Sequence, residues 1–166
     1  MGREIICFHN PDEDNGYLSN WWLSDFEVDG IKFTSAEQYM MWGKAKLFGD
    51  TEIQAKILDV TDVAKIKALG REVKGFDDAV WTANREQIVY TGLKSKFRDD
   101  AELREKLLST GDAILAECAV HDRVWGIGLS MKDPNRFDMS KWRGLSLLGK
   151  LLMQVRDELR ENRADD

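Results

Sequence analysis

The sequence has few of the residues that build disulfide frameworks and metal centres. Its 166 residues include only two cysteines and two histidines. Cys7 and Cys118 are too few for a disulfide framework, so we expect both to be reduced thiols. No pair of cysteines or histidines has the spacing of zinc ligands, and no spacing of carboxylates recommends a magnesium site. We therefore expect no metal.

Long apolar runs are also missing. No stretch approaches the ~20 apolar residues that a membrane span needs. The first residues, M-G-R-E-I-I-C-F, contain no apolar core of signal-peptide length, so we expect a cytoplasmic protein. The segment W-G-I-G-L, residues 125–129, matches neither glycine-rich phosphate loop, and no G-x-S-x-G hydrolase motif is present.

Positive charge is scarce as well. The chain has 24 lysines and arginines against 30 aspartates and glutamates, a net charge of −6. This balance argues against binding to long duplex nucleic acid, because such binding depends on many contacts of Lys and Arg with phosphates. It leaves room for a local pocket that binds one or two phosphates. Arg71, Lys74 and Arg85 could form a basic rim around such a pocket, or they are simply solvated surface charges.

The overall composition fits a soluble globular protein. Hydrophobic residues make up 43% of the chain and charged residues 33%, which is the usual balance of such proteins. Six tryptophans are many for this length, and their flat rings serve either a core or the stacking of a planar ligand. We expect one domain, residues 1–160, followed by a disordered tail, residues 161–166.

Hydrophobic periodicity and turn residues predict a mainly α-helical fold with a small N-terminal β-hairpin or strand element. Phe26–Phe33 alternates apolar and polar residues across Asp29-Gly30, which is typical of a hairpin. Asp50 and Thr61 are placed to cap two short helices, and Gly70 is placed to end the second. The predicted strands are 5–8 and 113–118, and the predicted helices are 34–48, 51–58, 62–69, 78–97, 101–108 and 145–159.

The helix predicted at Thr34–Phe48 carries the most informative pattern. Positions 37, 41, 44 and 48 recur at helical spacing, so they share one stripe beside the apolar face. The carboxylate of Glu37 and the amine of Lys44 then stand two turns apart, roughly 10 Å between backbones, a span that a sugar or nucleotide could fill. The alternative is structural: Thr34 and Glu37 form T-x-x-E, a helix capping box, and Lys44 is a solvated lysine.

A second polar and aromatic cluster follows the last predicted strand. It consists of His121-Asp122 and Trp125-Gly126. Asp122 is either a functional carboxylate or a loop cap, and Trp125 is either a stacking ring or a core ring. Trp81, near the start of its helix, has the same two interpretations.

Four segments of the chain, in a fixed order, point to one family. They are G-Y-L-S-N-W, then V-D-G-I-K-F-T-S-A-E-Q-Y-M-M-W-G-K, then W-G-I-G-L, then L-L-G-K-L-L-M-Q-V-R. No single segment is very specific. Together, over about residues 5–159, they resemble the signature blocks of the NADAR (YbiA-like) family.

This resemblance implies a mostly helical single domain, the YbiA-like fold, that hydrolyses N-glycosidic bonds without a metal or redox cofactor. It implies two substrate classes: ribosylamino-pyrimidine phosphate intermediates of riboflavin biosynthesis, and ADP-ribose attached to guanine in nucleic acid. We favour ADP-ribosylated guanine in single-stranded nucleic acid, because a single base in a flexible strand needs only a pocket and a short basic rim. Neither a membrane nor an obligate protein partner is implied.

The family's functional residues carry over to individual positions here. Its glutamate falls on Glu37, its lysine on Lys44 and its aspartate on Asp122, which we predict to be catalytic. The family often has an asparagine before the final L-G, whereas this chain has Ser146, which can hydrogen-bond but supplies no carboxamide. The substrate-binding residues that we predict are Ser19, Asn20, Arg71, Trp81, Trp125, Gly126 and Ser146.

Cleavage of an N-glycosidic bond builds positive charge on ribose C1 and the ring oxygen, which a carboxylate can stabilise. Glu37 suits this role, because a helix N-terminus favours its anionic form by roughly 0.3–1 kcal/mol. Asp122 suits orienting water or holding ribose hydroxyls. Lys44 admits two hypotheses: a neutral amine that attacks C1 and forms a Schiff base, or a cation that pairs with phosphate.

Two interpretations need no catalysis. A module that binds ADP-ribose or a nucleotide without cleaving it would keep the tryptophans and Ser19-Asn20, but would tolerate the loss of Glu37 and Asp122. A purely structural helical interaction domain would need no pocket at all.

Overall fold

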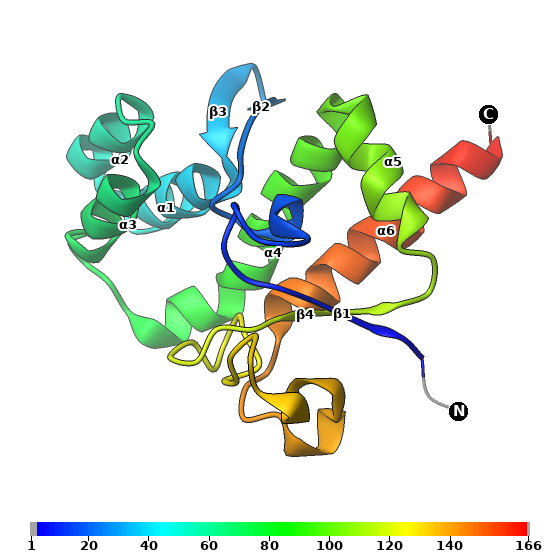
Figure 1. Cartoon of the computed structure of the whole chain (residues 1–166). Helices are drawn as coiled ribbons and strands as arrows, with labels where there is room; N and C mark the ends of the chain where they lie inside the picture. Colours follow the sequence, from blue (N-terminus) through cyan, green and yellow to red (C-terminus); the bar gives the residue numbers. More distant parts are fainter. Residues whose placement is uncertain (1–2, 166) are drawn as a thin grey trace. The chain divides into compact units, whose positions relative to one another are not determined.

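The protein was analysed as a computed structural model that describes residues 3–165. Within this range the chain forms six α-helices and four short strands, which confirms the predicted mainly α fold (Figure 1). No helix in the described range is long and apolar enough to cross a membrane. The chain divides into two compact units, residues 23–100 and the described residues before and after them.

The unit Leu23–Asp100 begins with the predicted hairpin and continues with four helices. Asp29 and Gly30 both have left-handed backbones, with φ of 51° and 81°, as a tight two-residue turn requires. The rings of Phe26 and Phe33, which are partners across the two strands, lie 5.9 Å apart. The elements are β2 (Leu23–Val28), β3 (Ile31–Ser35), α1 (Ala36–Leu47), α2 (Thr51–Leu58), α3 (Val63–Arg71) and α4 (Asp78–Asp99).

Helix α1 packs closely against α3 and α4, and glycines make this possible (Figure 1). A Cβ atom at Gly43 would lie 2.7 Å from Ile88 of α4. The prediction that Gly70 ends a helix was wrong: it lies inside α3, where a Cβ atom would collide with the sulfur of Met41. Thr61 is not the cap of this helix either, because the Asp62 side chain accepts the hydrogen bond.

The predicted capping box at the start of α1 was also wrong. Ser35, not Thr34, is the N-cap, and its hydroxyl accepts a hydrogen bond from the backbone N–H of Gln38 at 3.1 Å. The residue that reaches back is Gln38, whose Oε1 accepts the Thr34 backbone N–H at 2.7 Å. Ser35 and Gln38 therefore make this reciprocal cap.

Gln38 also joins α1 to α2. Its amide nitrogen donates to the carbonyl oxygens of Ile57 and Val60, both at 3.0 Å, at the C-terminal end of α2. The side chain is 2% exposed. The carbonyl groups at the end of a helix lack partners within the helix, and Gln38 adds a donor to those of Ile57 and Val60.

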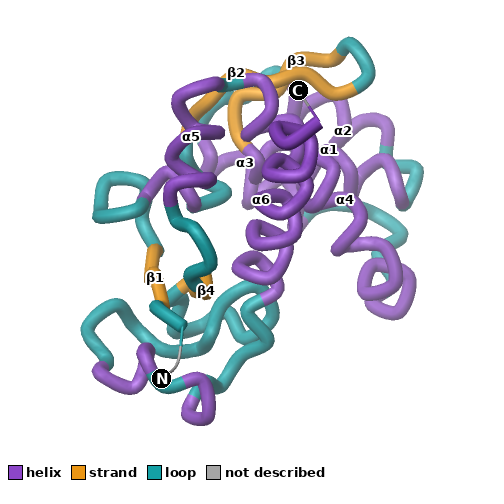
Figure 2. Tube along the Cα trace, turned by 90° about the vertical axis from the view of Figure 1, so that its right-hand side faces the viewer, coloured by secondary structure: helices purple, strands orange, loops and turns teal. Residues whose placement is uncertain are grey.

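The other unit combines the described N-terminal residues, 3–22, with residues 101–165. Its two strands pair in parallel, with Ile5 opposite Ile114 and Phe8 opposite Glu117 (Figure 2). The elements are β1 (Ile5–Phe8), α5 (Ala101–Ser109), β4 (Ile114–Glu117), α6 (Leu147–Asp165) and the 3-10 turns Gly16–Leu18, Pro134–Phe137 and Met139–Lys141.

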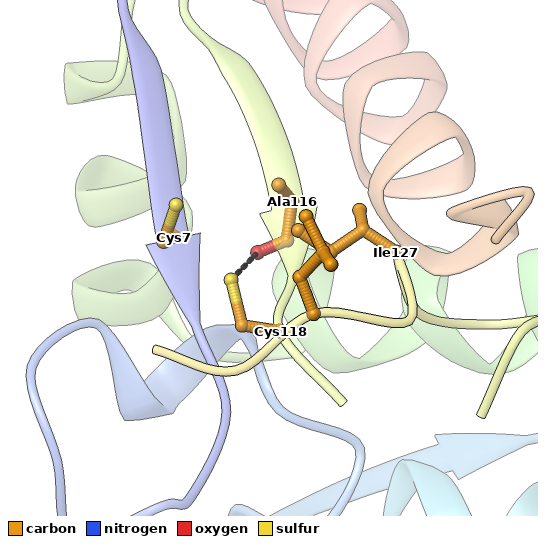
Figure 3. Close-up of a cluster of buried hydrophobic side chains, with 5 residues drawn as sticks. Cys7, Ala116, Cys118 and Ile127 are labelled. Carbon is orange, nitrogen blue, oxygen red and sulfur yellow. Dashed lines mark hydrogen bonds between the residues drawn. The ribbon is translucent and has the colours of Figure 1, made fainter. Parts of the chain in front are cut away.

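A small apolar cluster covers one side of this strand pair (Figure 3). Cys7 and Cys118 are both free thiols within it, and the Cys118 thiol lies 3.9 Å from the carbonyl oxygen of Ala116. The buried members are Cys7, Ala116, Cys118, Ile127 and Leu129.

Helix α6 is longer than predicted. It continues past Leu159 to Asp165, through most of the expected tail 161–166, whose last residue lies outside the described range. Ion pairs hold this end in place: Arg160 contacts Asp112 at 3.1 Å, and Arg163 contacts Glu105 at 3.2 Å. These partners lie far from the helix end in the sequence, so no local sequence pattern indicates them.

We expect Gln38→Ala to lower the free energy of unfolding by about 2–5 kcal/mol. The reason is that the Thr34 backbone N–H and the Val60 carbonyl oxygen lose the partner that Gln38 supplies, at about 1–3 kcal/mol for each group. Urea unfolding followed by circular dichroism measures the change. Gln87→Ala, on an exposed face of α4, is the matched control and should change stability by less than about 0.5 kcal/mol. Equal effects of the two substitutions would contradict the joining role of Gln38.

Candidate active site

Glu37 and Lys44 lie on the α1 stripe that faces α3. Met41, between them on this stripe, is the residue that a side chain at Gly70 would strike. The Lys44 ammonium donates a hydrogen bond to the Gly70 carbonyl oxygen at 2.8 Å. Glu37 is 5% exposed, in the first turn of the helix. The structure thus confirms the predicted stripe and places its carboxylate and amine on one side of α1.

The environment of Lys44 changes its protonation. Partial burial lowers the pKa of Lys44, because the charged form loses hydration. The Glu37 carboxylate acts in the opposite direction and raises the pKa, while the Arg71 guanidinium lowers it. Three predicted site residues are therefore electrostatically linked, and the amine of Lys44 deprotonates more easily than that of a solvated lysine.

Phe76 is a neighbour of Lys44 that the sequence did not reveal. The Lys44 ammonium lies 4.8 Å from the centre of the Phe76 ring. Phe76 follows Gly75, in the loop between α3 and α4. The sequence shows only an aromatic residue after a glycine, which does not indicate a contact with Lys44.

Trp81 and Arg85 stand one turn apart on α4, so they lie on the same face of the helix. Trp81 is buried, which favours its interpretation as a core ring. The Nε atom of Arg85 is buried and has no hydrogen-bond partner among residues 3–165. A buried guanidinium nitrogen without a partner is well suited to receive an anionic group.

In the other unit, Asp122 acts as a loop cap. Its Oδ1 accepts the backbone N–H groups of Val124 and Trp125, at 3.0 and 2.8 Å. These bonds agree with the structural interpretation of Asp122, and its catalytic role stays a prediction. Trp125 is only partly buried, so its ring is not a fully enclosed core ring.

Ser19 and Asn20 are both buried polar residues in the N-terminal part of the same unit. The Ser19 hydroxyl accepts the backbone N–H of Trp21 at 3.1 Å, so it has a structural role. The Oδ1 of Asn20 has no donor in the described part of the chain. Of the two residues, Asn20 has the more available polar atom for a ligand.

Gly126 and Ser146 are joined through their backbones. The Ser146 N–H donates to the Gly126 carbonyl oxygen at 3.0 Å. Ser146 has a left-handed backbone with φ of 52°, where asparagine is favoured over most residues, and its buried hydroxyl has no partner among the described residues. A Cβ atom at Gly126 would lie 2.9 Å from that of Ala119, so close packing requires glycine there.

The predicted site residues therefore fall into two groups. Glu37, Lys44 and Arg71 are brought together by α1 and α3, and Trp81 belongs to the same unit. Within the described residues, no three His, Cys, Asp or Glu side chains gather in a way that could hold a metal. The predicted residues of the other unit are Ser19, Asn20, Asp122, Trp125, Gly126 and Ser146.

The burial of Lys96 was not predicted from the sequence either. It is completely buried in α4, with its ammonium 5.0 Å from the centre of the Phe97 ring. Burial lowers its pKa from 10.5 to about 7. Lys96 lies three residues after Leu93 on the core side of the helix, and this placement of a charged residue was the available signal.

Known proteins resemble the chain over most of its length. N-glycosidase R617 of Acanthamoeba polyphaga mimivirus is 37% identical over 163 residues, 93% of this chain and 96% of that protein. N-glycosidase YbiA of Escherichia coli is 32% identical over 159 residues, 96% of this chain and 91% of YbiA. The NMR structure of E. coli YbiA matches with a TM-score of 0.82 and 29% identity, covering 100% of this chain and 90% of that one.

A third relative has a different name. Riboflavin biosynthesis protein VVA0006 of Vibrio vulnificus is 32% identical over 160 residues, which are 96% of this chain and 40% of that protein.

These similarities define the class of protein as an enzyme, an N-glycosyl hydrolase. The sequence model of the NADAR domain matches residues 7–160. The chain belongs to the NADAR family.

The role of Asp122 can be tested with a substitution that keeps its hydrogen bonds. Asp122→Asn retains an Oδ1 acceptor for the two backbone N–H groups but removes the charge. We expect it to fold normally and to lose activity if the carboxylate is catalytic, whereas Asp122→Ala should also lose about 1 kcal/mol of stability. Thermal unfolding and an N-glycosidase assay on both variants measure this. Wild-type activity of Asp122→Asn would leave Asp122 with the loop role alone.

Stability should depend on pH through Lys96. Its folded pKa, about 7, is below its unfolded value of 10.5, so the unfolded chain binds more protons between these pH values. The wild type should therefore gain stability relative to Lys96→Met as pH rises from 7 to 10, with the full penalty present below pH 7. Urea unfolding at pH 6.5, 8 and 9.5 measures the difference. Lys67→Met, an exposed control on α3, should show no such trend. A pH-independent difference for Lys96→Met would contradict the lowered pKa.

Proposed function

We propose that this N-glycosyl hydrolase removes ADP-ribose from ADP-ribosylated guanine in single-stranded nucleic acid. The observation that supports the chemistry is the pairing of a half-buried lysine, Lys44, with a buried carboxylate, Glu37, on one stripe of α1. The sequence resemblance supports the same two residues. The proposal covers both the bond that is broken and the substrate that carries it.

Lys44 is proposed as the nucleophile. Its lowered pKa increases the fraction of neutral amine near neutral pH, which a solvated lysine lacks. The amine attacks ribose C1, the C1–N bond breaks, and the electron pair leaves with the guanine nitrogen, which takes up a proton. The nitrogen then loses a proton, the bond between C1 and the ring oxygen breaks, and the ring oxygen takes up a proton, which leaves an open sugar joined to Lys44 by a C=N bond. Water adds to C1 of this Schiff base, the C1–N bond to Lys44 breaks, and ADP-ribose leaves as the free sugar while the amine is regenerated.

Glu37 is proposed to stabilise the positive charge that develops on C1 and the ring oxygen. Because Ser35 and Gln38 make the bonds of the α1 cap, the Glu37 carboxylate is not required there. Its charge also favours the ammonium form of Lys44, so it opposes the effect of burial on that pKa. A carboxylate in this position can act on the sugar and on the lysine.

Two arginines support an ADP-ribose substrate with its two phosphates. Arg71 is exposed at the end of α3, and its positive charge lowers the pKa of Lys44. Arg85 has a buried Nε without a partner among the described residues. Guanidinium groups bind phosphate oxygens through several N–H groups at once. These two residues supply positive charge locally in a chain of net charge −6.

A second substrate is favoured by one specific observation. The Vibrio relative is named a riboflavin biosynthesis protein. A ribosylamino-pyrimidine phosphate has the same type of C1–N bond and a single phosphate, so Lys44 and Glu37 could act on it in the same way. Its single phosphate would need fewer positive charges than ADP-ribose does.

The test is a side-by-side assay on an ADP-ribosylated guanine oligonucleotide and a ribosylamino-pyrimidine phosphate. We expect faster cleavage of the oligonucleotide, with loss of the ADP-ribose mass from the strand. Borohydride added during turnover should link the sugar to the wild type and to Lys46→Met, but not to Lys44→Met. Lys46 is the matched control, because it is exposed on the same helix and lies 5.2 Å from the centre of the Trp42 ring.

Glu37→Gln should lower kcat by at least about 100-fold without loss of the fold, because it keeps the size and removes the charge. Glu52→Gln, on the exposed side of α2, should have no effect. Three results would overturn parts of the proposal. Comparable turnover by Glu37→Gln would remove Glu37 from the mechanism. Cleavage of the substrate without borohydride trapping of the sugar on Lys44 would show that Lys44 is not the nucleophile, and its role would then be to bind phosphate. Binding of the oligonucleotide without any cleavage would identify a binding module.

A further inference from the structure

The loop that carries Phe76 is fixed at both ends. Before Phe76, the backbone N–H of Lys74 donates to Asp50 Oδ2 at 2.9 Å, and the other oxygen of Asp50 caps α2. After Phe76, Asp77 caps α4 by accepting the backbone N–H groups of its first turn. Gly75 has a left-handed backbone with φ of 80°, a conformation that favours glycine. The backbone of Phe76 is therefore held by the caps of two helices.

The ring of Phe76 is held from one side and exposed over much of its surface. Its centre lies 5.4 Å from that of Phe48, the residue that follows Lys44 by one turn on the same stripe of α1. The residue is 46% exposed. A phenylalanine contributes to stability mainly through burial, so the exposed part of this ring adds little to the stability of the fold.

The ammonium of Lys44 is a second neighbour of this ring. One of its N–H groups donates to the Gly70 carbonyl oxygen at 2.8 Å, and the ammonium lies 4.8 Å from the centre of the Phe76 ring. An ammonium has three N–H groups, and Lys44 makes no other hydrogen bond to residues 3–165. Two contacts thus hold the nitrogen, and further N–H groups are available to a substrate.

We propose that Phe76 is a positioning residue for the reaction: with the Gly70 carbonyl, its ring fixes the nitrogen of Lys44 between α1 and the loop before α4. The catalytic consequence rests on the proposed function of Lys44, whereas the contact itself does not. A nucleophile gains rate when its nitrogen is held in one place relative to the sugar. A four-carbon side chain without these two contacts would sample many conformations.

The ring also affects the charge of Lys44. The face of an aromatic ring attracts a cation and does not attract a neutral amine to the same degree. Phe76 therefore opposes the effect of burial, as the Glu37 carboxylate does, and keeps part of the ammonium form. Removal of the ring, with most of its volume retained, should therefore lower the pKa of Lys44 further.

The direct test is NMR of protein labelled with 13C-lysine, in which Lys44→Arg identifies the Lys44 signal. In the wild type and in Phe76→Tyr, the ring should shift the Lys44 Hε resonances upfield. Phe76→Leu should abolish this shift and lower the pKa of Lys44. Phe137→Leu is the matched control, because Phe137 is 53% exposed and has Arg136 at 4.1 Å from its ring. It should change neither quantity. Phe76→Met, which also lacks a ring face, repeats the test if Phe76→Leu fails to fold.

The kinetic test uses borohydride trapping as a function of pH. Phe76→Leu should move the ascending limb of the profile to lower pH and reduce the plateau on the order of 10-fold, because the amine is less well placed. Phe76→Tyr should restore both.

The two levels of the proposal fail in different ways. An unchanged Lys44 resonance and pKa in Phe76→Leu and Phe76→Met would overturn the positioning role, even if Lys44 is trapped. Absence of trapping in the wild type, together with the expected NMR changes, would overturn the nucleophilic role of Lys44 and leave the contact intact.

Discussion

The start of α1 depends on one buried carboxamide. Gln38 accepts a hydrogen bond from the backbone of Thr34 and donates two to the end of α2. A glutamate could not replace it, because an ionised carboxylate has no N–H to donate and would face two carbonyl oxygens. Since Gln38 satisfies these backbone groups, the neighbouring Glu37 need not serve as a cap. The chemistry that we propose for Glu37 is thus made possible by the residue beside it.

Close helix packing has a similar double effect around Lys44. Gly70 lets α3 approach Met41 of α1 more closely than any side chain would allow. The same approach brings the Gly70 carbonyl oxygen within hydrogen-bond distance of the Lys44 ammonium. One glycine therefore serves both the packing of two helices and the position of a functional nitrogen. Substitution at such a glycine would change stability and activity together.

The sequence predicted features that depend on neighbouring residues. The Asp29-Gly30 hairpin and the α2 helix capped by Asp50 are confirmed, because their turn and cap chemistry is local. The stripe of Glu37 and Lys44 follows from helical spacing alone. Gly70 was misinterpreted because a glycine that ends a helix and one that packs against another helix have the same local pattern.

Features that depend on distant partners could not be predicted. The parallel pairing of β1 with β4 joins segments that are 109 positions apart in the sequence, since Ile5 lies opposite Ile114. The cap at Ser35 and Gln38 was hidden by the T-x-x-E pattern one residue earlier, and only the carbonyl groups of α2 explain the choice of Gln38. The contact of Phe76 with Lys44 likewise requires the fold, because the two residues are 32 positions apart in the sequence, with α2 and α3 between them.

The two compact units differ in how the chain builds them. Residues 23–100 form one uninterrupted stretch, whereas the other unit is assembled from both ends of the chain. During synthesis on a ribosome, the uninterrupted unit is complete before β4 emerges, while β1 must wait for its parallel partner. Closing so long a loop slows the pairing but adds little to its equilibrium cost, because loop entropy grows only with the logarithm of length. The Glu37 and Lys44 stripe is therefore available to fold early, and the Cys7 thiol remains without its apolar cover until the C-terminal part of the chain has been made.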